Sequence, residues 1–418
     1  MKMEHTDFHH QLTDAVEQNR RISKLAAFRY ELNESQTMDS APSGDIAGRE
    51  QAIGGMLTLI WQDGSISLHQ LTRELLHADS LPLGEWREQR FLHDGYRYFV
   101  KPSKAPLPVV PLFDPLIAQA VYRQEMPDLP DGFDATLTVH KRTVTHSKGL
   151  QLEDEGTAIR LTPKDLSFPF GHRGRLFPSE REMTYLETEW QWFSRFPLSV
   201  SDQLDQVTQE TVLLFSPEAL GTLIHSGLGV HLTNPASLSL AHSFLEQCAT
   251  KTSLTLRYDP HVPWALGSQR FSAEGNRTAA VTLLSPVRVE KQVEKPAFLA
   301  PHDAFEHKLS PGPSYSQEAL RLAAGTVHHF REWLRLKPEV LYIPTLALPE
   351  SYAPWAEESA WVPEAFLFKR GRPVCRGAFP LSFSLTSILC ATEAELVSKI
   401  GWDRPGLALP ARLLDSTS

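Results

Sequence analysis

Cysteine is scarce in this chain. Its 418 residues include three cysteines, Cys248, Cys375 and Cys390, and none of them forms a Cys-x-x-Cys pair. So few thiols cannot build a disulfide scaffold, and they indicate a reducing compartment. The sequence also has no apolar run long enough to span a bilayer and no apolar stretch behind Met1 of the kind found in secretory signals. We therefore expect a cytoplasmic protein that does not enter a membrane.

An excess of basic charge is missing as well. The chain has 41 Lys and Arg residues against 50 Asp and Glu residues, a net charge of -9, and its basic residues are scattered. Tracking a phosphate backbone requires clustered Lys and Arg, so we expect no nucleic-acid partner. The hydrophobic fraction of 41% and the length of 418 residues are typical of a globular chain with two domain-sized cores.

Hydrophobic periodicity predicts both helices and strands in the first half. Helical spacing covers residues 8–20, and alternating apolar and polar side chains cover 25–37. The Asp63-Gly64 turn precedes a second helical pattern over 68–79. Seven prolines between residues 101 and 130 predict a segment that runs over the surface.

The second half shows more strand patterns, together with one long helical pattern. Strands are predicted at 254–258, 279–284, 287–293 and 340–348, and a hairpin around Arg370-Gly371. A helix is predicted over 317–336. The two strands at 279–284 and 287–293 are consistent with an antiparallel meander rather than with parallel sheet units.

These patterns predict an α+β fold with two domains. Residues 1–200 would form a mixed α/β domain that ends in an acidic, aromatic helix over 180–196. Residues 201–418 would form a domain of mainly antiparallel strands around a central helix.

That central helix has a strong start signal. Ser216 can cap it, Pro217 suits its first turn, and Glu218 complements the positive end of the helix dipole. Residues then recur at helical spacing and predict one stripe that faces a core, formed by Leu220, Leu223, Ile224, Leu228 and His231.

The block that contains this helix reads Leu-Phe-Ser-Pro-Glu-Ala-Leu-Gly-Thr-Leu-Ile-His-Ser-Gly-Leu-Gly-Val-His from 214 to 231. It resembles the TldD/PmbA family, whose active members carry a His-Glu-x-x-x-His zinc motif after a similar Pro-Glu-Ala lead-in. His225 matches the first histidine of the motif. Ser226 replaces the glutamate, Val230 replaces the second histidine, and His231 comes one residue too late.

The resemblance also holds in the order of elements over three separate regions: the N-terminal third of the chain, residues 205–290, and the last 55 residues. One departure is large. The family's glycine-rich His-Gly-x-Asn-x-x-x-Gly-Asp-x-Ser element is absent, and residues 349–361 occupy its place. Any contact with substrate or partner that depends on that element is therefore not carried over to this chain.

The substitutions remove the chemistry of the motif. Zinc hydrolysis needs imidazole ligands, an open position for water and a carboxylate that accepts a proton from that water. Ser226 cannot accept this proton at neutral pH, and one step along a helix turns His231 by about 100° away from the ligand position. The same family uses a C-terminal cysteine as third ligand, and Cys375 is a counterpart in position. Residues 373–376 do not match the surroundings of that cysteine, so its role is not carried over.

The resemblance therefore implies a TldE-like subunit without its own metal. Such a subunit pairs with a zinc-bearing TldD-like relative, and together they degrade or mature small unfolded or modified peptides. We expect no cofactor in this chain and zinc in the partner, with a homodimer as an alternative assembly. Two rival functions stay open: an active metallopeptidase with a rebuilt site of His225, His231 and Cys375, and a peptide-binding accessory protein of a peptide-modification pathway.

Other clusters have simpler readings. His225, His231 and His242 could form an improvised zinc site with Cys248, although packing and solvent contacts explain them more simply. Adjacent His328 and His329 would point about 100° apart on a helix and would not chelate one ion.

Two further groups of side chains also favour ordinary roles. His302, Asp303, Glu306 and His307 could bind a cation but are typical of a solvated loop. An aromatic cluster could grip a peptide, but hydrophobic packing is the favoured interpretation. It comprises Tyr185, Trp190, Trp192, Phe193 and Phe196.

Overall fold

The structure is a computed structural model. It describes residues 6–17, 24–40, 46–92, 106–129, 132–147, 149–164, 171–196, 208, 210–224, 228, 238–271, 275, 278, 280–286, 319–323, 327–348, 358–400, 402 and 404–413. Within these residues the chain forms two sheets of seven strands, one sheet of three strands and helices packed against them. No helix in this part of the chain is long and apolar enough to cross a membrane. The predicted α+β fold is confirmed, whereas the division at residue 200 stays a prediction.

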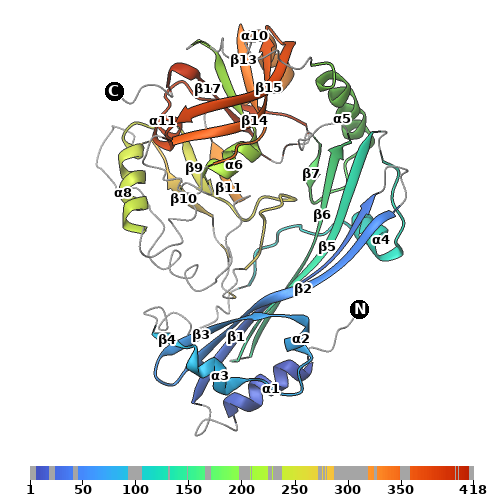
Figure 1. Ribbon diagram of the computed structural model, residues 1–418, viewed down its shortest axis with the longest axis vertical. Helices are drawn as coiled ribbons and strands as arrows, with labels where there is room; N and C mark the ends of the chain where they lie inside the picture. The colour runs from blue at the N-terminus through green and yellow to red at the C-terminus, as the bar shows by residue number, and fades with distance from the viewer. Residues whose placement is uncertain are drawn as a thin grey trace.

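The first sheet is a long, twisted and fully antiparallel layer that runs through the lower part of Figure 1. Its strand order is β4-β3-β2-β1-β5-β6-β7. The strands are β1 (Leu25–Ser40), β2 (Ile46–Trp61), β3 (Ser65–Leu71), β4 (Phe91–Leu92), β5 (Phe133–His146), β6 (Leu150–Pro163) and β7 (Arg173–Gly174). Tight turns join neighbours: Gly64 and Gly149 adopt positive φ angles of 83° and 82°, which glycine reaches without steric cost.

Short helices cover this sheet at its two ends. α1 (Thr6–Glu17), α2 (Arg73–Leu76) and α3 (Leu83–Glu88) lie near the lower end, where Phe8 and Leu12 of α1 pack against Phe28 of β1. α4 (Pro115–Arg123) packs toward the other end, next to β5 and β6.

The prediction for residues 101–130 is wrong over α4. Asp114 caps this helix by accepting from the Leu116 N–H at 2.9 Å, and Pro115 starts it. Its inner side chains Ile117 and Val121 are buried in the core. Proline therefore marked a helix start here and not a surface loop.

The second sheet is mixed and lies at the top of Figure 1, with strand order β12-β16-β17-β8-β13-β14-β15. Pairs β12/β16 and β8/β13 are parallel, and the remaining neighbours are antiparallel. The predicted hairpin at Arg370-Gly371 is confirmed, since it joins β14 to β15. The strands are β8 (Val212–Phe215), β12 (Val327–His329), β13 (Glu339–Ile343), β14 (Glu358–Lys369), β15 (Arg372–Phe383), β16 (Glu395–Ser398) and β17 (Gly406–Pro410).

Both faces of the second sheet are covered by hydrophobic side chains. On one face, Leu213 and Phe215 pack with α6 (Pro217–Ile224), α8 (Leu238–Ala249) and α11 (Leu385–Leu389). On the other face, Leu214 packs with α5 (Glu180–Phe193) and α10 (Phe330–Leu336). Successive residues of β8 thus serve opposite cores, as strand geometry requires.

A small antiparallel sheet, in the order β10-β9-β11, lies between the two larger ones. Its strands are β9 (Thr255–Tyr258), β10 (Val281–Leu284) and β11 (Leu320–Ala323). The strands predicted at 254–258 and 279–284 are confirmed, and the one predicted at 287–293 lies outside the described residues.

Two helix predictions are wrong in part. Residues 68–71 belong to β3, which pairs with β2 in the register Leu57↔His69. Within 68–79, only the four residues of α2 are helical. In 317–336, helix begins only at Phe330, because the residues before it pair as β11 with β9 and as β12 with β16. Strand pairing with distant residues overrode the local periodicity at both places.

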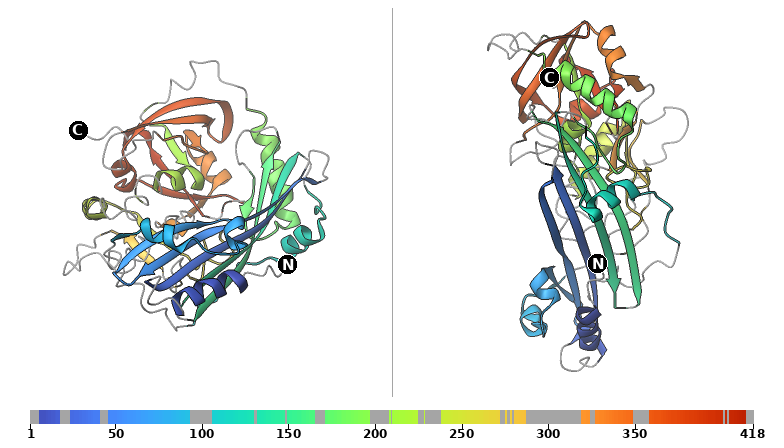
Figure 2. Two further views of the ribbon diagram at one scale, coloured as in Figure 1. Left: turned by 60° about the horizontal axis from the view of Figure 1, so that its bottom comes forward. Right: turned by 90° about the vertical axis from the view of Figure 1, so that its right-hand side faces the viewer.

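Helix α5 connects the two large cores. Leu186 near its middle packs with Leu137 and Ile159 of the first sheet, while Phe193 at its end packs with Phe330 and Phe366 beside the second sheet. Figure 2 shows α5 running from the end of the first sheet to the second. The packing interpretation of the aromatic cluster is therefore confirmed for Phe193 and its neighbours.

A buried ion pair fixes α5 to the second sheet. Lys399 Nζ lies 2.5 Å from Glu189 Oε2, and the two side chains are 0% and 1% exposed. The Lys399 ammonium also lies 5.5 Å from the centre of the Trp402 ring. The charge of Glu189 contributes to raising the pKa of Tyr185, after burial as the main cause.

We predict that Lys399→Met lowers the free energy of unfolding by about 3–5 kcal/mol, because it leaves a buried carboxylate without its counter-ion. Denaturant unfolding followed by tryptophan fluorescence measures this loss. Arg412→Met is the matched control: it removes the exposed pair with Glu393 and should change stability by at most about 1 kcal/mol. The double variant Glu189→Leu/Lys399→Met should be more stable than Lys399→Met alone; equal stability would contradict the ion-pair explanation.

Candidate functional site

The helix that leads into the degenerate motif begins as predicted. Ser216 Oγ accepts the N–H groups of Glu218 at 3.1 Å and Ala219 at 3.0 Å. The same hydroxyl donates to the Pro344 carbonyl at 2.5 Å, which ties the helix start to the end of β13. One serine thus caps α6 and positions it against the second sheet.

The predicted stripe is confirmed for its four apolar residues. Leu220, Leu223 and Ile224 are at most 4% exposed, and Leu228 beyond the helix is fully buried. All four belong to the core on one face of the second sheet. The stripe therefore holds α6 in the core.

The motif positions themselves, His225, Ser226, Val230 and His231, lie outside the described residues, as does the side chain of His242. Their identities come from the sequence, and the predicted absence of a working site there stays a prediction. Among the residues that the structure does describe, no group of three His, Cys, Asp or Glu side chains could hold a metal ion.

Cys375 does not suit the role of a metal ligand. It lies on β15 opposite Leu367 of β14, fully buried in the apolar core. Burial raises the pKa of its thiol, with a smaller upward contribution from Glu339 that the charge of Lys369 opposes. A metal-binding cysteine is a thiolate, which this environment disfavours.

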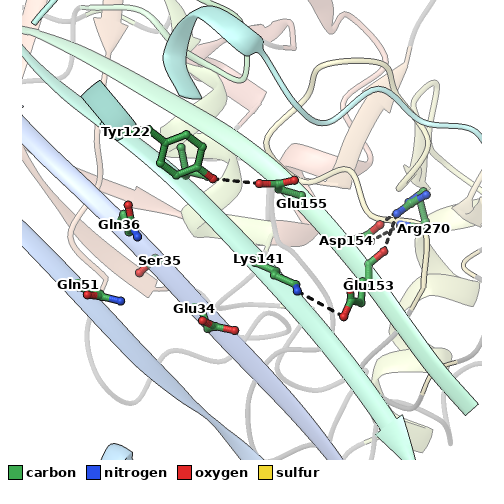
Figure 3. Close-up of a pocket in the computed structure, with 11 residues that line it drawn as sticks. Glu34, Ser35, Gln36, Gln51, Tyr122, Lys141, Glu153, Asp154, Glu155 and Arg270 are labelled. Atoms are coloured by element: carbon green, nitrogen blue, oxygen red, sulfur yellow. Dashed lines mark hydrogen bonds and ion pairs between the residues drawn. The ribbon is translucent and has the colours of Figure 1, made fainter. Parts of the chain in front are cut away.

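A polar groove lies on the first sheet, a feature that the motif analysis missed. Its volume is about 440 Å³. Figure 3 shows side chains from β1, β2, β5, β6 and α4 around it, with Arg270 at one side. The lining residues are Glu34, Ser35, Gln36, Gln51, Tyr122, Val139, Lys141, Glu153, Asp154, Glu155 and Arg270.

Hydrogen bonds and ion pairs hold the walls of this groove. Lys141 Nζ lies 3.3 Å from Glu153 Oε1, and Tyr122 donates its hydroxyl to Glu155 Oε1 at 3.0 Å. Burial, followed by the bond to Glu155 and the charge of that carboxylate, raises the pKa of Tyr122 to about 12. The hydroxyl therefore stays a donor at neutral pH.

The groove has the composition of a binding surface. Among the described lining residues, carboxylates outnumber the two cationic side chains, and neither cysteine nor histidine is present. Its one serine, Ser35, has no histidine in the lining to act as its base. Such a surface can hold polar or basic segments of a ligand. The alternation of apolar and polar residues along β1 and β5 is enough to predict that Glu34, Gln36 and Lys141 lie in strands. That these residues line one groove with Arg270 depends on the tertiary fold.

Arginine side chains bind the segment 265–271 to the first sheet beside this groove. Arg175 donates to the carbonyls of Ala265 and Leu266, each at 2.8 Å, and to that of Ser268 at 3.0 Å. Arg270 in turn pairs with Asp154 of β6. The segment therefore cannot leave the sheet without exposing several buried donors and acceptors.

Arg142 makes a second attachment for the same segment. It forms an ion pair with Glu31 of β1 at 2.6 Å and donates to the Phe271 carbonyl at 2.9 Å. Its guanidinium lies 5.1 Å from the centre of the Phe271 ring. Residues 272–274 lie outside the described residues.

His140 lies among these arginines. Its Nε2 is 3.2 Å from Arg175 Nη1, so the imidazole accepts a hydrogen bond when it is neutral. Burial, and then the charges of Arg175 and Arg142, lower the pKa of His140 to about 4. Protonation would therefore oppose the contacts that hold segment 265–271.

The remaining histidines have ordinary places where the structure describes them. His328 and His329 lie on strand β12 and not on the predicted helix, half-buried and exposed respectively. Successive strand residues face opposite sides, so the two rings do not converge. His302, Asp303, Glu306 and His307 lie outside the described residues.

Comparison with known proteins gives a structural likeness only. No family model matches the chain, and no curated protein matches it in sequence. Among solved structures, TldE from Thermococcus kodakarensis is similar with a TM-score of 0.58 at 15% identity, covering 95% of this chain and 98% of that one.

Two further solved structures are similar to nearly the same extent. A candidate modulator of a DNA gyrase from Thermotoga maritima gives a TM-score of 0.58 at 14% identity, with 97% of this chain and 98% of that one covered. A candidate modulator of DNA gyrase from Bacteroides thetaiotaomicron gives 0.57 at 16% identity, with 98% of each chain covered. The chain therefore has the TldD/TldE fold over nearly its whole length, as the sequence resemblance implied.

We predict that acid weakens this structure partly through His140. A histidine with a pKa of 6.5 when unfolded and about 4 when folded binds protons more readily in the unfolded state between those values. Stability should thus be full above pH 6.5 and fall as the pH drops to about 4, by up to about 3 kcal/mol from this group. Unfolding free energies measured at several pH values test this.

His140→Gln keeps an acceptor for Arg175 and should flatten the dependence on pH. His69 requires its own control, since burial against Trp86 also lowers the pKa of His69 to about 4. His69→Gln should remove only the part of the pH dependence of stability that His69 contributes. An unchanged pH dependence in His140→Gln would show that His140 does not carry the effect.

Proposed function

We propose that this chain is the non-catalytic, TldE-like subunit of a metallopeptidase complex that degrades or matures small unfolded or modified peptides. The observation that carries the proposal is the likeness to the whole of TldE, combined with Ser226 and Val230 at the positions of the motif glutamate and second histidine. A chain with this fold and these residues has the scaffold but not the ligands or the base.

The state of Cys375 supports the same conclusion. A rebuilt zinc site would need a third ligand, and this thiol lies in an apolar core that raises its pKa. No step of hydrolysis is therefore assigned to this chain. Zinc and the proton-accepting glutamate would come from a TldD-like partner that carries an intact His-Glu-x-x-x-His motif.

The contribution of this chain would be to hold the peptide. An unfolded peptide presents its own backbone donors and acceptors, which a strand at a sheet edge can bind by strand addition. The polar groove adds side-chain contacts, through Glu34, Glu153 and Glu155, for basic or polar positions of a peptide. The partner would then cut what this chain presents.

Metal analysis and reconstitution test this proposal. We expect the purified chain to contain zinc well below one ion per molecule and to leave an unfolded peptide intact. Cleavage should appear when a subunit with the intact zinc motif is added, and should disappear when the motif glutamate of that subunit is replaced. Mass spectrometry of the products and elemental analysis supply the two measurements.

His225→Ala separates the proposal from its rivals. In the reconstituted complex this variant should retain the wild-type rate, because His225 lacks the other residues of a zinc site. One zinc per isolated chain together with loss of cleavage in His225→Ala would instead show an active, rebuilt peptidase. Peptide binding by the chain alone, with no cleavage on adding the zinc subunit, would indicate an accessory binding protein.

A further inference from the structure

Two cysteines that are far apart in the sequence meet beside α8. Cys248 lies on α8 and is fully buried, and Cys390 directly follows α11 and is half-buried. The Cys390 thiol lies 3.9 Å from the Cys248 carbonyl oxygen, across 142 residues of chain. Both thiols are free.

Hydrogen bonds hold the two cysteine-bearing segments together. Thr252, just after α8, donates its hydroxyl to the Leu389 carbonyl, and Ser253 donates to the Ala391 carbonyl at 2.9 Å. These bonds flank Cys390 on both sides. The proximity of the two cysteines therefore results from a bonded contact between segments.

The two thiols differ in reactivity. A hydrogen bond between the side chains lowers the pKa of Cys390 and raises the pKa of Cys248, and the charge of Lys251 favours both thiolates. The thiolate is the reactive form of cysteine. Cys390 is the more exposed of the two, so an oxidant from solution reaches it first and it is the attacking thiol, while the fully buried Cys248 resolves the intermediate.

We propose that Cys248 and Cys390 form a reversible intramolecular disulfide when the chain meets a low-molecular-weight disulfide such as oxidised glutathione. The Cys390 thiolate attacks one sulfur of the oxidant, whose S–S bond breaks and releases one thiolate that takes up a proton. Cys248 then loses its proton and attacks the Cys390 sulfur, which releases the second thiol. The chain loses two hydrogens, and the oxidant is reduced to two thiols.

The local geometry permits this reaction. The sulfurs must approach to about 2.0 Å, so one side chain has to rotate. Cys390 is the C-cap residue of α11, with φ -95° and ψ 4°, and its side chain lies outside the helical turns. Rotation there leaves the helical hydrogen bonds in place.

The bond would join helices α8 and α11, which pack in the same core. Because the bond forms only under oxidising conditions, the attachment of α8 to this core would depend on the redox state of the surroundings. In the sequence, α8 follows the degenerate motif. This inference does not depend on the proposed function, since it concerns only the two thiols and their contacts.

Thiol chemistry on the full chain tests the inference. After treatment with oxidised glutathione, we expect the wild-type chain to lose two titratable thiols and to yield a peptide that links Cys248 to Cys390 in a non-reducing map. The mass should fall by about 2 Da, because two hydrogens leave. The midpoint temperature of thermal unfolding should rise when the bond forms, since the bond closes a long loop, and should return to its original value after reduction.

Cys375→Ser is the matched control and should form the bond like the wild type, because Cys375 lies in β15. Cys248→Ser should stop at a mixed disulfide with glutathione on Cys390, and Cys390→Ser should not react. A wild-type map without the Cys248–Cys390 peptide would overturn the inference, whether Cys390 carries glutathione, links two chains or stays reduced. If a variant fails to fold, the non-reducing peptide map of the wild-type chain is sufficient to test the inference.

Discussion

The pairing of Glu189 with Lys399 is the contact on which the joining of the two halves depends. Helix α5 has one turn in the core of the first sheet, through Leu186, and its last turn in the core of the second, through Phe193. Two fully buried charges in a low-dielectric interior tolerate little separation, so the pair fixes the position of α5 along its axis. Hydrophobic contacts alone, being non-directional, would allow the helix to slide.

The arginines around segment 265–271 attach this segment to the first sheet. Arg142 and Arg175 direct planar guanidinium groups at backbone carbonyls, which no substitution within the segment can remove. Carbonyls bound in this way hold a chain without regular secondary structure against a sheet. The polar groove beside it owes one wall, Arg270, to this attachment.

Helix α6 is held by packing and capping that do not involve the motif residues. Ser216 still caps the helix, and Leu220 and Leu223 still hold it in the core, although the sequence then places serine and valine where a base and a ligand would stand. Packing and capping depend on side-chain size and on one hydroxyl. Zinc hydrolysis depends instead on specific ligands and acid–base groups, so the fold and the chemistry rest on different residues.

The sequence by itself determined the features that depend on neighbouring residues: the α6 start at Ser216, the hairpin at Gly371 and the residues of the degenerate motif. Capping, turns and motif spacing need only a few consecutive side chains. The tertiary structure alone decided that the helical pattern over 68–79 begins as strand β3, because β2 lies beside it, and that Cys375 is sealed in a core. It also brought Cys248 to Cys390 and Arg270 to Asp154, contacts between residues more than a hundred positions apart, which no local pattern encodes.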